Sequence, residues 1–244
     1  MKTKTITFIP STNRTTDYFD PPVSAVKVLP EWYKQQPAHI GGEFAVSETG
    51  TANITVKKCM PVLDDMTAGY IISTCCDLFV KHNPEDPMNG PKNISWSLQT
   101  EFPTEIISTH STEQISHFPV PMGYNVFPFK FNNFWRIKTP KGYSCMFRHP
   151  FYHSSNQPFY SLSGIVDTDT YPQTINFPFL IHKEFEGIIP MGTPIIQLIP
   201  FKRVDWESVV SEEDNSTGVS EFNYATRKWM HRYKDNWRVI KSWK

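Results

Sequence analysis

The chain has 244 residues, of which 39% are hydrophobic and 14% aromatic. That apolar content is enough to bury a sizeable core without disulfides or a structural metal. The 24 basic residues balance the 24 acidic ones, so we do not expect net charge to draw the chain to nucleic acid or an anionic membrane. Its 21 prolines predict short elements joined by stiff turns rather than long helices.

The beginning of the chain and its cysteines bear on location. Residues 1–10 hold no apolar run long enough for a signal peptide, and no stretch approaches the roughly 18 apolar residues of a membrane span. The four cysteines show neither a CxxC pair nor the spacing of a secreted disulfide framework. We therefore expect reduced thiols in a cytoplasmic protein that does not bind membranes.

The N-terminal third begins with a predicted strand at residues 3–9, whose β-branched and aromatic residues end at Pro10. The rest of residues 1–42 is rich in proline, and Pro30 favours a one-turn helix over residues 29–34. A polar loop is predicted at 82–93. Between these segments the sequence predicts short β runs at 52–56, 70–73 and 77–81.

The middle of the chain is typical of an all-β sandwich or barrel, because short apolar runs alternate with turn signals. Residues 187–194 look like a tight turn before the last strand. The predicted strands are 94–99, 134–138, 143–147, 164–167, 175–181 and 195–201. We expect one domain, made of the N-terminal segment 1–42, a β core at 43–203 and a C-terminal part at 204–244.

The C-terminal part begins with an acidic stretch at 205–214, and residues 220–243 are predicted to form a basic amphipathic helix. Trp229, Tyr233 and Trp237 would share one face of that helix, since they are four residues apart. The helix could bind nucleic acid or a partner protein through this face. Docking of the aromatic stripe on the β core is the simpler interpretation, and we favour it.

The segment from Ser163 to Tyr171 is the most informative for chemistry, because paired carboxylates and an aromatic residue follow a short strand. Asp167 would stand at the strand end, where it could polarise a water or hold a sugar hydroxyl. Tyr171 could stack on a planar ring. The alternative is a turn in which Asp167 or Asp169 accepts hydrogen bonds from nearby amides, and spacing alone favours this alternative.

Residues 164–171, Gly-Ile-Val-Asp-Thr-Asp-Thr-Tyr, resemble a motif of trimeric dUTPases and related dCTP deaminases. Three further segments are similar to motifs of that family in the same order, so the resemblance is collinear over roughly residues 65–203. They are Thr67–Tyr70, Pro140–Tyr143 and Gly192–Ile199. The resemblance implies a β-clip fold, a distorted jelly-roll-like barrel, assembled as a homo-oligomer and typically a trimer.

The resemblance also implies roles for single residues. Asp167 matches the family residue that orients water and the sugar 3′-hydroxyl, which makes it the candidate catalytic residue. Gln197 matches the glutamine of the family's late strand. Arg148 lies near the family's phosphate-binding arginine, and Tyr171 matches only if a bulge absorbs the extra Thr170. With Asp169, these residues form the candidate site for a nucleotide or related small molecule.

Departures from the family pattern decide the expected activity. Thr67 stands where the family has an acid, the phosphate-binding turn lacks its serine and glycine, and no Gly-rich tail follows. A triphosphate needs several cationic or amide donors at once. We therefore expect no classical dUTP hydrolysis, and the chain is either an altered nucleotide binder or a protein without enzymatic activity.

A second resemblance covers more of the chain. The pattern, including Leu29–Lys34, Trp135–Tyr143 and Ile199–Arg203, resembles an uncharacterised family of tailed phages and some bacteria. This resemblance implies the competing function, a phage-type structural or interaction protein that uses the barrel as a scaffold. Such a protein would lie in the cytoplasm of an infected host cell or in the virion.

A divalent-metal site is a further hypothesis. His149 and His153 are four residues apart, the spacing that places two ligands on one helix face, and Asp167 and Asp169 could add oxygen ligands. Pro150 argues against a helix there. We favour two histidines in a polar loop without a metal.

Overall fold

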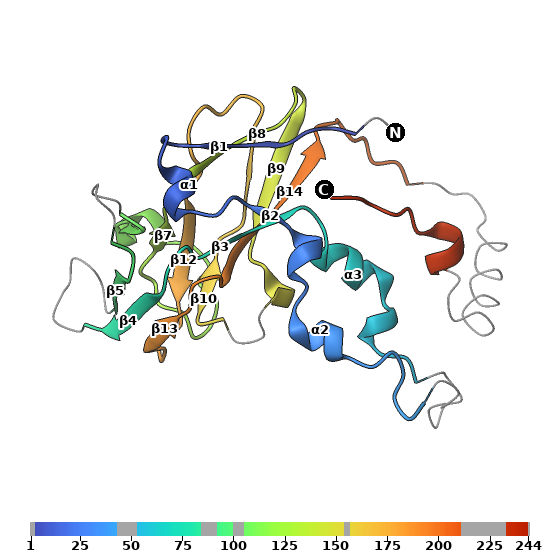
Figure 1. The fold of residues 1–244 in the computed structure, drawn as a ribbon, viewed down its shortest axis with the longest axis horizontal. Helices are drawn as coiled ribbons and strands as arrows, with labels where there is room; N and C mark the ends of the chain where they lie inside the picture. The colour runs from blue at the N-terminus through green and yellow to red at the C-terminus, as the bar shows by residue number, and fades with distance from the viewer. Residues whose placement is uncertain are drawn as a thin grey trace.

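The computed structural model describes residues 3–42, 53–83, 92–99, 105–153, 157–210 and 233–243. Within these residues the chain is rich in β-structure, and its strands pair antiparallel in four separate sheets (Figure 1). None of the described helices is long and apolar enough to cross a membrane.

The strands are short, as the many prolines predict. They are β1 (Thr7–Pro10), β2 (Val23–Ser24), β3 (Tyr70–Ser73), β4 (Leu78–His82), β5 (Lys92–Trp96), β6 (Ile107–Thr109), β7 (Phe129–Phe131), β8 (Trp135–Lys138), β9 (Tyr143–Arg148), β10 (Phe159–Ser161), β11 (Gly164–Val166), β12 (Phe177–Ile181), β13 (Gly187–Ile189) and β14 (Pro194–Lys202). The helices are α1 (Thr15–Tyr18), α2 (Glu31–Gln35), α3 (Met60–Met66), the 3₁₀ turns Ala25–Val28, Val56–Lys58, Thr112–Ile115 and Phe151–His153, and a π-helical turn at Tyr233–Trp237.

The largest sheet has the strand order β11–β9–β14–β3–β2. Its longest strand, β14, pairs with β9 on one side and β3 on the other, so that Gln197 lies between Arg148 and Ile71. The other sheets are β10–β12–β7–β6, β13–β4–β5 and β1–β8. The large sheet therefore gathers segments that are up to 179 positions apart, from Val23 to Lys202.

Phenylalanine rings join the sheets in one buried cluster. Phe131 of β7 stacks on Phe179 of β12 with ring centroids 3.8 Å apart, and Phe159 of β10 meets Phe179 edge-on. Phe147 brings the large sheet into the same cluster through Phe177. Burial of these rings supplies much of the apolar stabilisation of the fold.

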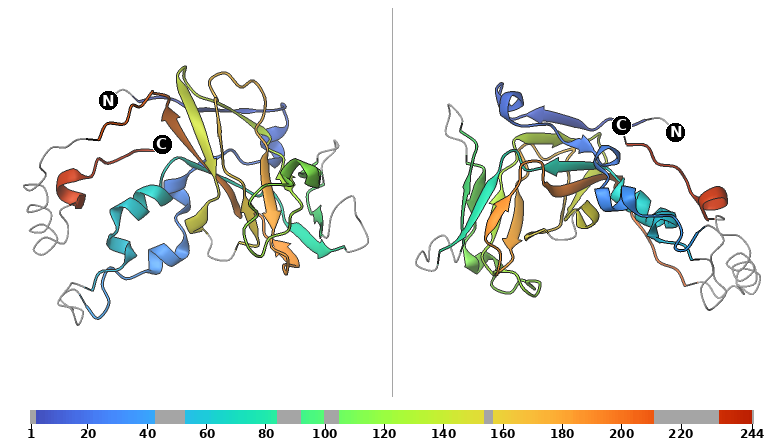
Figure 2. Two further views of the ribbon diagram at one scale, coloured as in Figure 1. Left: turned by 180° about the vertical axis from the view of Figure 1, so that it is seen from behind. Right: turned by 60° about the horizontal axis from the view of Figure 1, so that its bottom comes forward.

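The helices α2 and α3 lie at one end of the molecule. Figures 1 and 2 show α2 and α3 together beyond one end of the large sheet, with the three-stranded sheet at the opposite end. Helix α3 has a proline at its start and is followed by Gly69, whose φ of +68° leads the chain into β3.

The expected β-rich class and most of the expected strands are confirmed within the described residues. The predicted one-turn helix at 29–34 is α2. Three sequence predictions differ from the structure. The described strands form four sheets and no closed barrel. Residues 187–189, expected in a turn, form β13. Around Ile54 the structure has only an isolated bridge to His39.

The predicted C-terminal helix is also corrected. Residues 211–232, including Trp229, lie outside the described residues, and helical geometry ends at Trp237. Residues 238–243 run back toward the start of the chain without helical structure (Figure 2). Arg238 and Lys241 both pair with Asp64 of α3, at 2.6 and 2.7 Å. These ion pairs give the segment a tertiary anchor, which the helical periodicity could not reveal.

Candidate functional site

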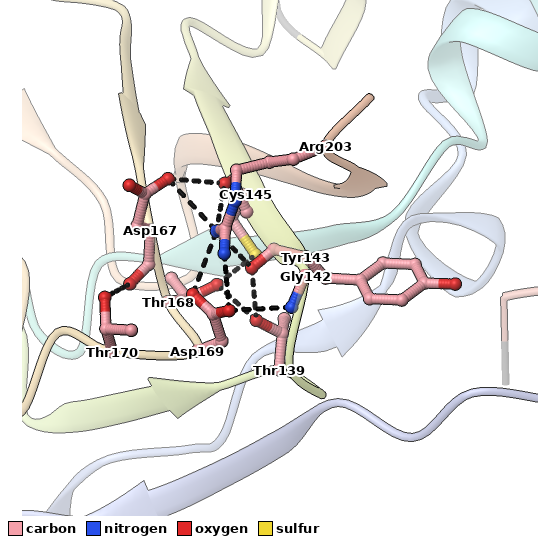
Figure 3. Close-up of polar contacts among 10 residues, drawn as sticks. Thr139, Gly142, Tyr143, Cys145, Asp167, Thr168, Asp169, Thr170 and Arg203 are labelled. Atoms are coloured by element: carbon pink, nitrogen blue, oxygen red, sulfur yellow. Dashed lines mark hydrogen bonds and ion pairs between the residues drawn. The ribbon is translucent and has the colours of Figure 1, made fainter. Parts of the chain in front are cut away.

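Three strand ends meet around the guanidinium group of Arg203. Arg203 follows β14, and its backbone N–H donates to the carbonyl of Gly142, just before β9. The end of β11 lies beside the same part of β9, because Val166 pairs with Cys145. The carboxylates of Asp167 and Asp169 thereby both pair with the same cation (Figure 3).

Asp169 is the buried member of this group, with a side chain 3% exposed. Its Oδ2 accepts hydrogen bonds from Arg203 Nη2 at 2.5 Å and from the Gly142 N–H at 2.8 Å. The charge-assisted bonds from Arg203 and the bond from Gly142 hold the pKa of Asp169 at about 2, below its ordinary value. Asp169 therefore ties the turn after β11 to the loop before β9.

The buried side chain of Thr168 attaches the turn to Thr139 and Cys145. Its hydroxyl lies 2.7 Å from that of Thr139 and 3.4 Å from the Cys145 sulfur, and all three groups are buried. Burial raises the pKa of the Cys145 thiol to about 11, so this cysteine is not a thiolate near neutral pH. The cysteine is structural, as its place in a strand predicts.

Asp167 differs from Asp169, because its side chain is 61% exposed. One carboxylate oxygen, Oδ1, accepts from Ser144 Oγ at 2.6 Å and from Arg203 Nη1 at 3.2 Å. The other oxygen has no hydrogen-bond partner among the described residues, and it points away from the network in Figure 3. The group is thus oriented by the protein and still able to accept a hydrogen bond from outside.

Tyr171 closes the turn. Its backbone N–H donates to the Asp167 carbonyl at 2.9 Å, and its side chain is 41% exposed. The same carbonyl accepts from the N–H of Thr170, so residues 167–171 form a tight turn. An oriented carboxylate and an exposed aromatic ring therefore belong to one short turn.

Arg148 and Gln197 form a second network at the other end of β9. Gln197 is 2% exposed, and its Oε1 accepts from Arg148 Nη2 at 3.0 Å. Its Nε2 donates to the carbonyls of Asp65 and Ala68, each at 2.8 Å. All hydrogen-bonding groups of this glutamine amide are used within the protein, at the C-terminal end of α3.

Arg148 completes this helix end. Its Nη2 lies 2.6 Å from the Asp65 carboxylate and donates to the Asp65 carbonyl at 3.2 Å. A cation at a helix C-terminus also interacts favourably with the helix dipole. The arginine therefore has a structural role in attaching α3 to the large sheet.

The two networks do not form one pocket. Ser144, which binds Asp167, and Arg148 are four residues apart on β9, or about 13 Å along an extended strand. The structure thus brings Asp167, Asp169 and Tyr171 together but places Arg148 and Gln197 elsewhere. These two residues cannot supply a phosphate cradle next to Asp167 without a large rearrangement.

The two histidines have separate protein partners. His149 Nδ1 accepts from the Ser161 N–H at 3.2 Å, and burial lowers the pKa of His149 to about 4. The ring nitrogens of His153 face the carbonyls of Val28 and Met66, and burial lowers its pKa as well. Among the described residues, no group of three or more histidine, cysteine or acidic residues is arranged to hold a metal ion.

Arg203 and Ser144 are the site residues that sequence reasoning did not identify. Arg203 belongs to no motif of the nucleotide-related resemblance, and only the order of strands in the sheet brings it to the aspartates. The sequence signal that could have indicated Arg203 was the pair of carboxylates after β11, because two carboxylates so close together favour a cation on a neighbouring strand. Without the strand order, that cation could not be assigned.

Comparison with models of known protein families finds no match, and comparison with curated proteins finds none either. The resemblance to the dUTPase-like superfamily therefore rests on the four motifs alone. In the structure these motifs contain or lead into β3, β9, β11 and β14, which lie in one sheet.

Proposed function

We propose that the chain is a member of the dUTPase-like superfamily that binds a nucleoside or a related polyhydroxylated small molecule at Asp167, without classical dUTP hydrolysis. The carboxylate would accept a hydrogen bond from a ligand hydroxyl, and Tyr171 would stack on the ligand ring. The observation that carries the proposal is the half-satisfied carboxylate of Asp167, which is 61% exposed and held by Ser144 and Arg203.

The electrostatics favour a hydroxyl over a phosphate at this position. Two carboxylates, those of Asp167 and Asp169, already neutralise Arg203, and together the three groups carry a net negative charge. Such a group repels a triphosphate, whereas a carboxylate oxygen is a strong acceptor for an O–H donor. Arg148 is engaged with Asp65 and offers no free charge.

The fold part of the proposal is a β-clip-like arrangement in a homo-oligomer, with a trimer as the expected form. It is supported by the neighbouring positions of the motif-related strands in the order β11–β9–β14–β3. Mass measurement in solution tests the oligomeric state independently of ligand binding.

A thermal-stability screen tests the ligand part. We expect uridine, thymidine or deoxycytidine to raise the melting temperature of the wild-type protein, and their triphosphates to do so less. Asp167→Ala should abolish the shift, because it removes the acceptor. Asp17→Ala is the matched control, since Asp17 is also an exposed aspartate paired with an arginine, at 3.2 Å. The proposal fails if none of the nucleosides stabilises the wild-type protein, or if Asp167→Ala responds as the wild type does.

The second candidate function is a non-enzymatic structural or interaction protein of phage type, with the β framework as a scaffold. The hydrogen bonds among Asp169, Gly142 and Arg203 favour this second function, because these three residues satisfy one another's polar groups within the protein. This candidate predicts no stabilisation by any nucleoside and full stability of Asp167→Ala.

A further inference from the structure

A cavity of about 280 Å³ lies between the large sheet, the phenylalanine cluster and the N-terminal segment. It is distinct from the proposed nucleoside site, because neither Asp167 nor Tyr171 lines it. Engineered apolar cavities of about 150 Å³ bind benzene. The volume here is therefore enough for a small aromatic molecule with one or two substituents.

The floor of the cavity is apolar and buried. It is formed by side chains of β3, β7, β12 and β14 together with their neighbours, and each is at most 9% exposed. They include Phe19, Ile71, Ile106, Phe131, Phe177 and Ile195. Such a surface excludes water and favours an apolar ligand through the hydrophobic effect.

The cavity is also lined by exposed residues from two chain segments. One is the N-terminal segment at Asp20 and Pro21, and the other is the turn at Met191 and Gly192. All four residues are exposed, so the lining of the cavity extends to the protein surface. The buried floor and the exposed lining residues together describe a pocket that a ligand can enter from solvent.

Trp135 is a residue of the wall that carries an unused hydrogen-bond donor. It lies in β8, lines the cavity and is 6% exposed. Its indole Nε1–H is buried and has no hydrogen-bond partner among the residues that the structure describes. A buried donor without an acceptor costs free energy, since the donor has lost its water. A ligand that carries an acceptor atom would remove this cost.

Among the described residues that line the cavity, Trp135 is the one with a buried side-chain nitrogen or oxygen atom that has no hydrogen-bond partner, and three neighbouring polar side chains are satisfied. The Asn132 side chain accepts from Ser108 and donates to the carbonyl of Glu105, and the Asn133 side chain bonds to the backbone of Trp135. The hydroxyl of Thr74 donates to the Pro190 carbonyl. The unpaired indole donor therefore favours a ligand with a hydrogen-bond acceptor over one without it.

We propose that this cavity binds a small, mainly apolar aromatic molecule with one hydrogen-bond acceptor, which receives the Nε1–H of Trp135. Apolar contact with the floor provides most of the affinity, and the indole donor provides the preference for an oxygen-bearing ligand.

Two probes of similar size test the proposal. Acetophenone has a carbonyl acceptor, whereas isopropylbenzene has a methyl group in its place. In NMR titrations of the full chain, we expect both to bind the wild-type protein, with acetophenone bound about fivefold more tightly, the factor for one net hydrogen bond. Trp135→Phe removes the donor and leaves the carbonyl of acetophenone unpaired in an apolar cavity, so the preference for acetophenone should be lost or reversed.

Blocking variants show that binding takes place in the cavity. Val23→Phe adds a ring at a lining position on β2, and Ile106→Phe does the same from another wall, so one variant remains if the other fails to fold. Both should abolish binding of the two probes. Ile165→Phe is the control, because Ile165 is exposed on β11 and does not line the cavity.

The proposal is overturned if neither probe binds, if a folded blocking variant still binds, or if the wild-type protein shows no preference for acetophenone. It is also overturned if Trp135→Phe keeps the preference. Asp167→Ala should bind acetophenone normally, so failure of the nucleoside proposal leaves this result intact.

Discussion

Strand β9 carries an arginine network at each end, and the two differ in what they leave unsatisfied. At the C-terminal end, Arg148 and Gln197 use their polar groups to bind the end of α3. At the N-terminal end, Arg203 holds two aspartates, and one oxygen of Asp167 has no partner among the described residues. Similar residue types thus build two different networks. At the C-terminal end of β9, the closed end, the polar groups are satisfied within the protein. At its N-terminal end, the open end, one carboxylate oxygen is left without a partner among the described residues.

The difference teaches that residue type alone does not separate binding sites from structural joints. Gln197 matches a family motif and is completely used by the fold, whereas Arg203 belongs to no motif of that family and organises the exposed carboxylate. Exposure and unused hydrogen-bonding capacity are the properties that distinguish the two ends.

The largest effect should come from a glycine at the closed end. Gly69 has a φ of +68°, and a Cβ built there would lie 1.9 Å from the carbonyl oxygen of Leu198. Gly69→Ala must therefore move β14 or the end of α3, and we expect a loss of at least about 3 kcal/mol of unfolding free energy. Denaturant unfolding measures this loss.

Gly142 is the matched control at the open end. Its φ of +85° is also left-handed, but nothing lies within 4 Å of a Cβ built there. Gly142→Ala should cost only about 1 kcal/mol, from backbone strain alone. Equal losses for the two variants would show that the closed end is not tightly packed.

The next largest effect should be the dependence of the free energy of unfolding on pH, which involves His149. This residue directly follows Arg148. Burial lowers the pKa of His149 to about 4, so the unfolded chain holds more protons than the folded protein between about pH 6.5 and 4. Stability should be full above pH 6.5 and fall through this window, by about 2 kcal/mol after allowance for partial exposure of the ring.

Unfolding curves at pH 7 and pH 4.5 measure the effect of His149. His149→Asn keeps an acceptor for the Ser161 N–H and does not titrate, so its stability should fall less between the two pH values. The same fall in both proteins would show that His149 is accessible to protons in the folded state.

The smallest losses of stability should come from substitutions of the two aspartates at the open end. Which of the two substitutions costs more stability tests the different roles of Asp167 and Asp169. Asp167→Asn should change stability by less than about 1 kcal/mol, because the carboxylate is exposed. Asp169→Asn should lower the melting temperature more, since Asp169 binds both Arg203 and the Gly142 N–H. The reverse order, measured by scanning calorimetry, would contradict the division of roles between them.

The sequence predicts strands well where apolar and β-branched residues run for several positions. This is the case for β3, β8, β9 and β14, whose patterns need only local information. The strands β6, β7 and β10 have only three residues each and were not predicted. Their strand geometry depends on pairing partners distant in sequence, which no local pattern contains.

The candidate site could be predicted only in part, for the same physical reason. The position of Asp167 at a strand end follows from the Gly164–Val166 pattern and is confirmed. The separation of Arg148 from Asp167 depends on their placement at opposite ends of β9, and the pairing of Arg203 with both aspartates depends on the neighbours of β14. The buried donor of Trp135 is likewise a property of the folded packing alone.

The alternation of side chains along β9 ties its two arginine networks to the same alignment of the strand. Ser144 and Arg148 point to one face, whereas Cys145 and Phe147 point to the phenylalanine cluster on the other. A slip of one position against β14 would expose Phe147, bury Arg148 and separate Ser144 from Asp167 in a single step. Misaligned forms of this sheet would thus lose apolar burial and both charged joints together, which leaves the native alignment without a close competitor.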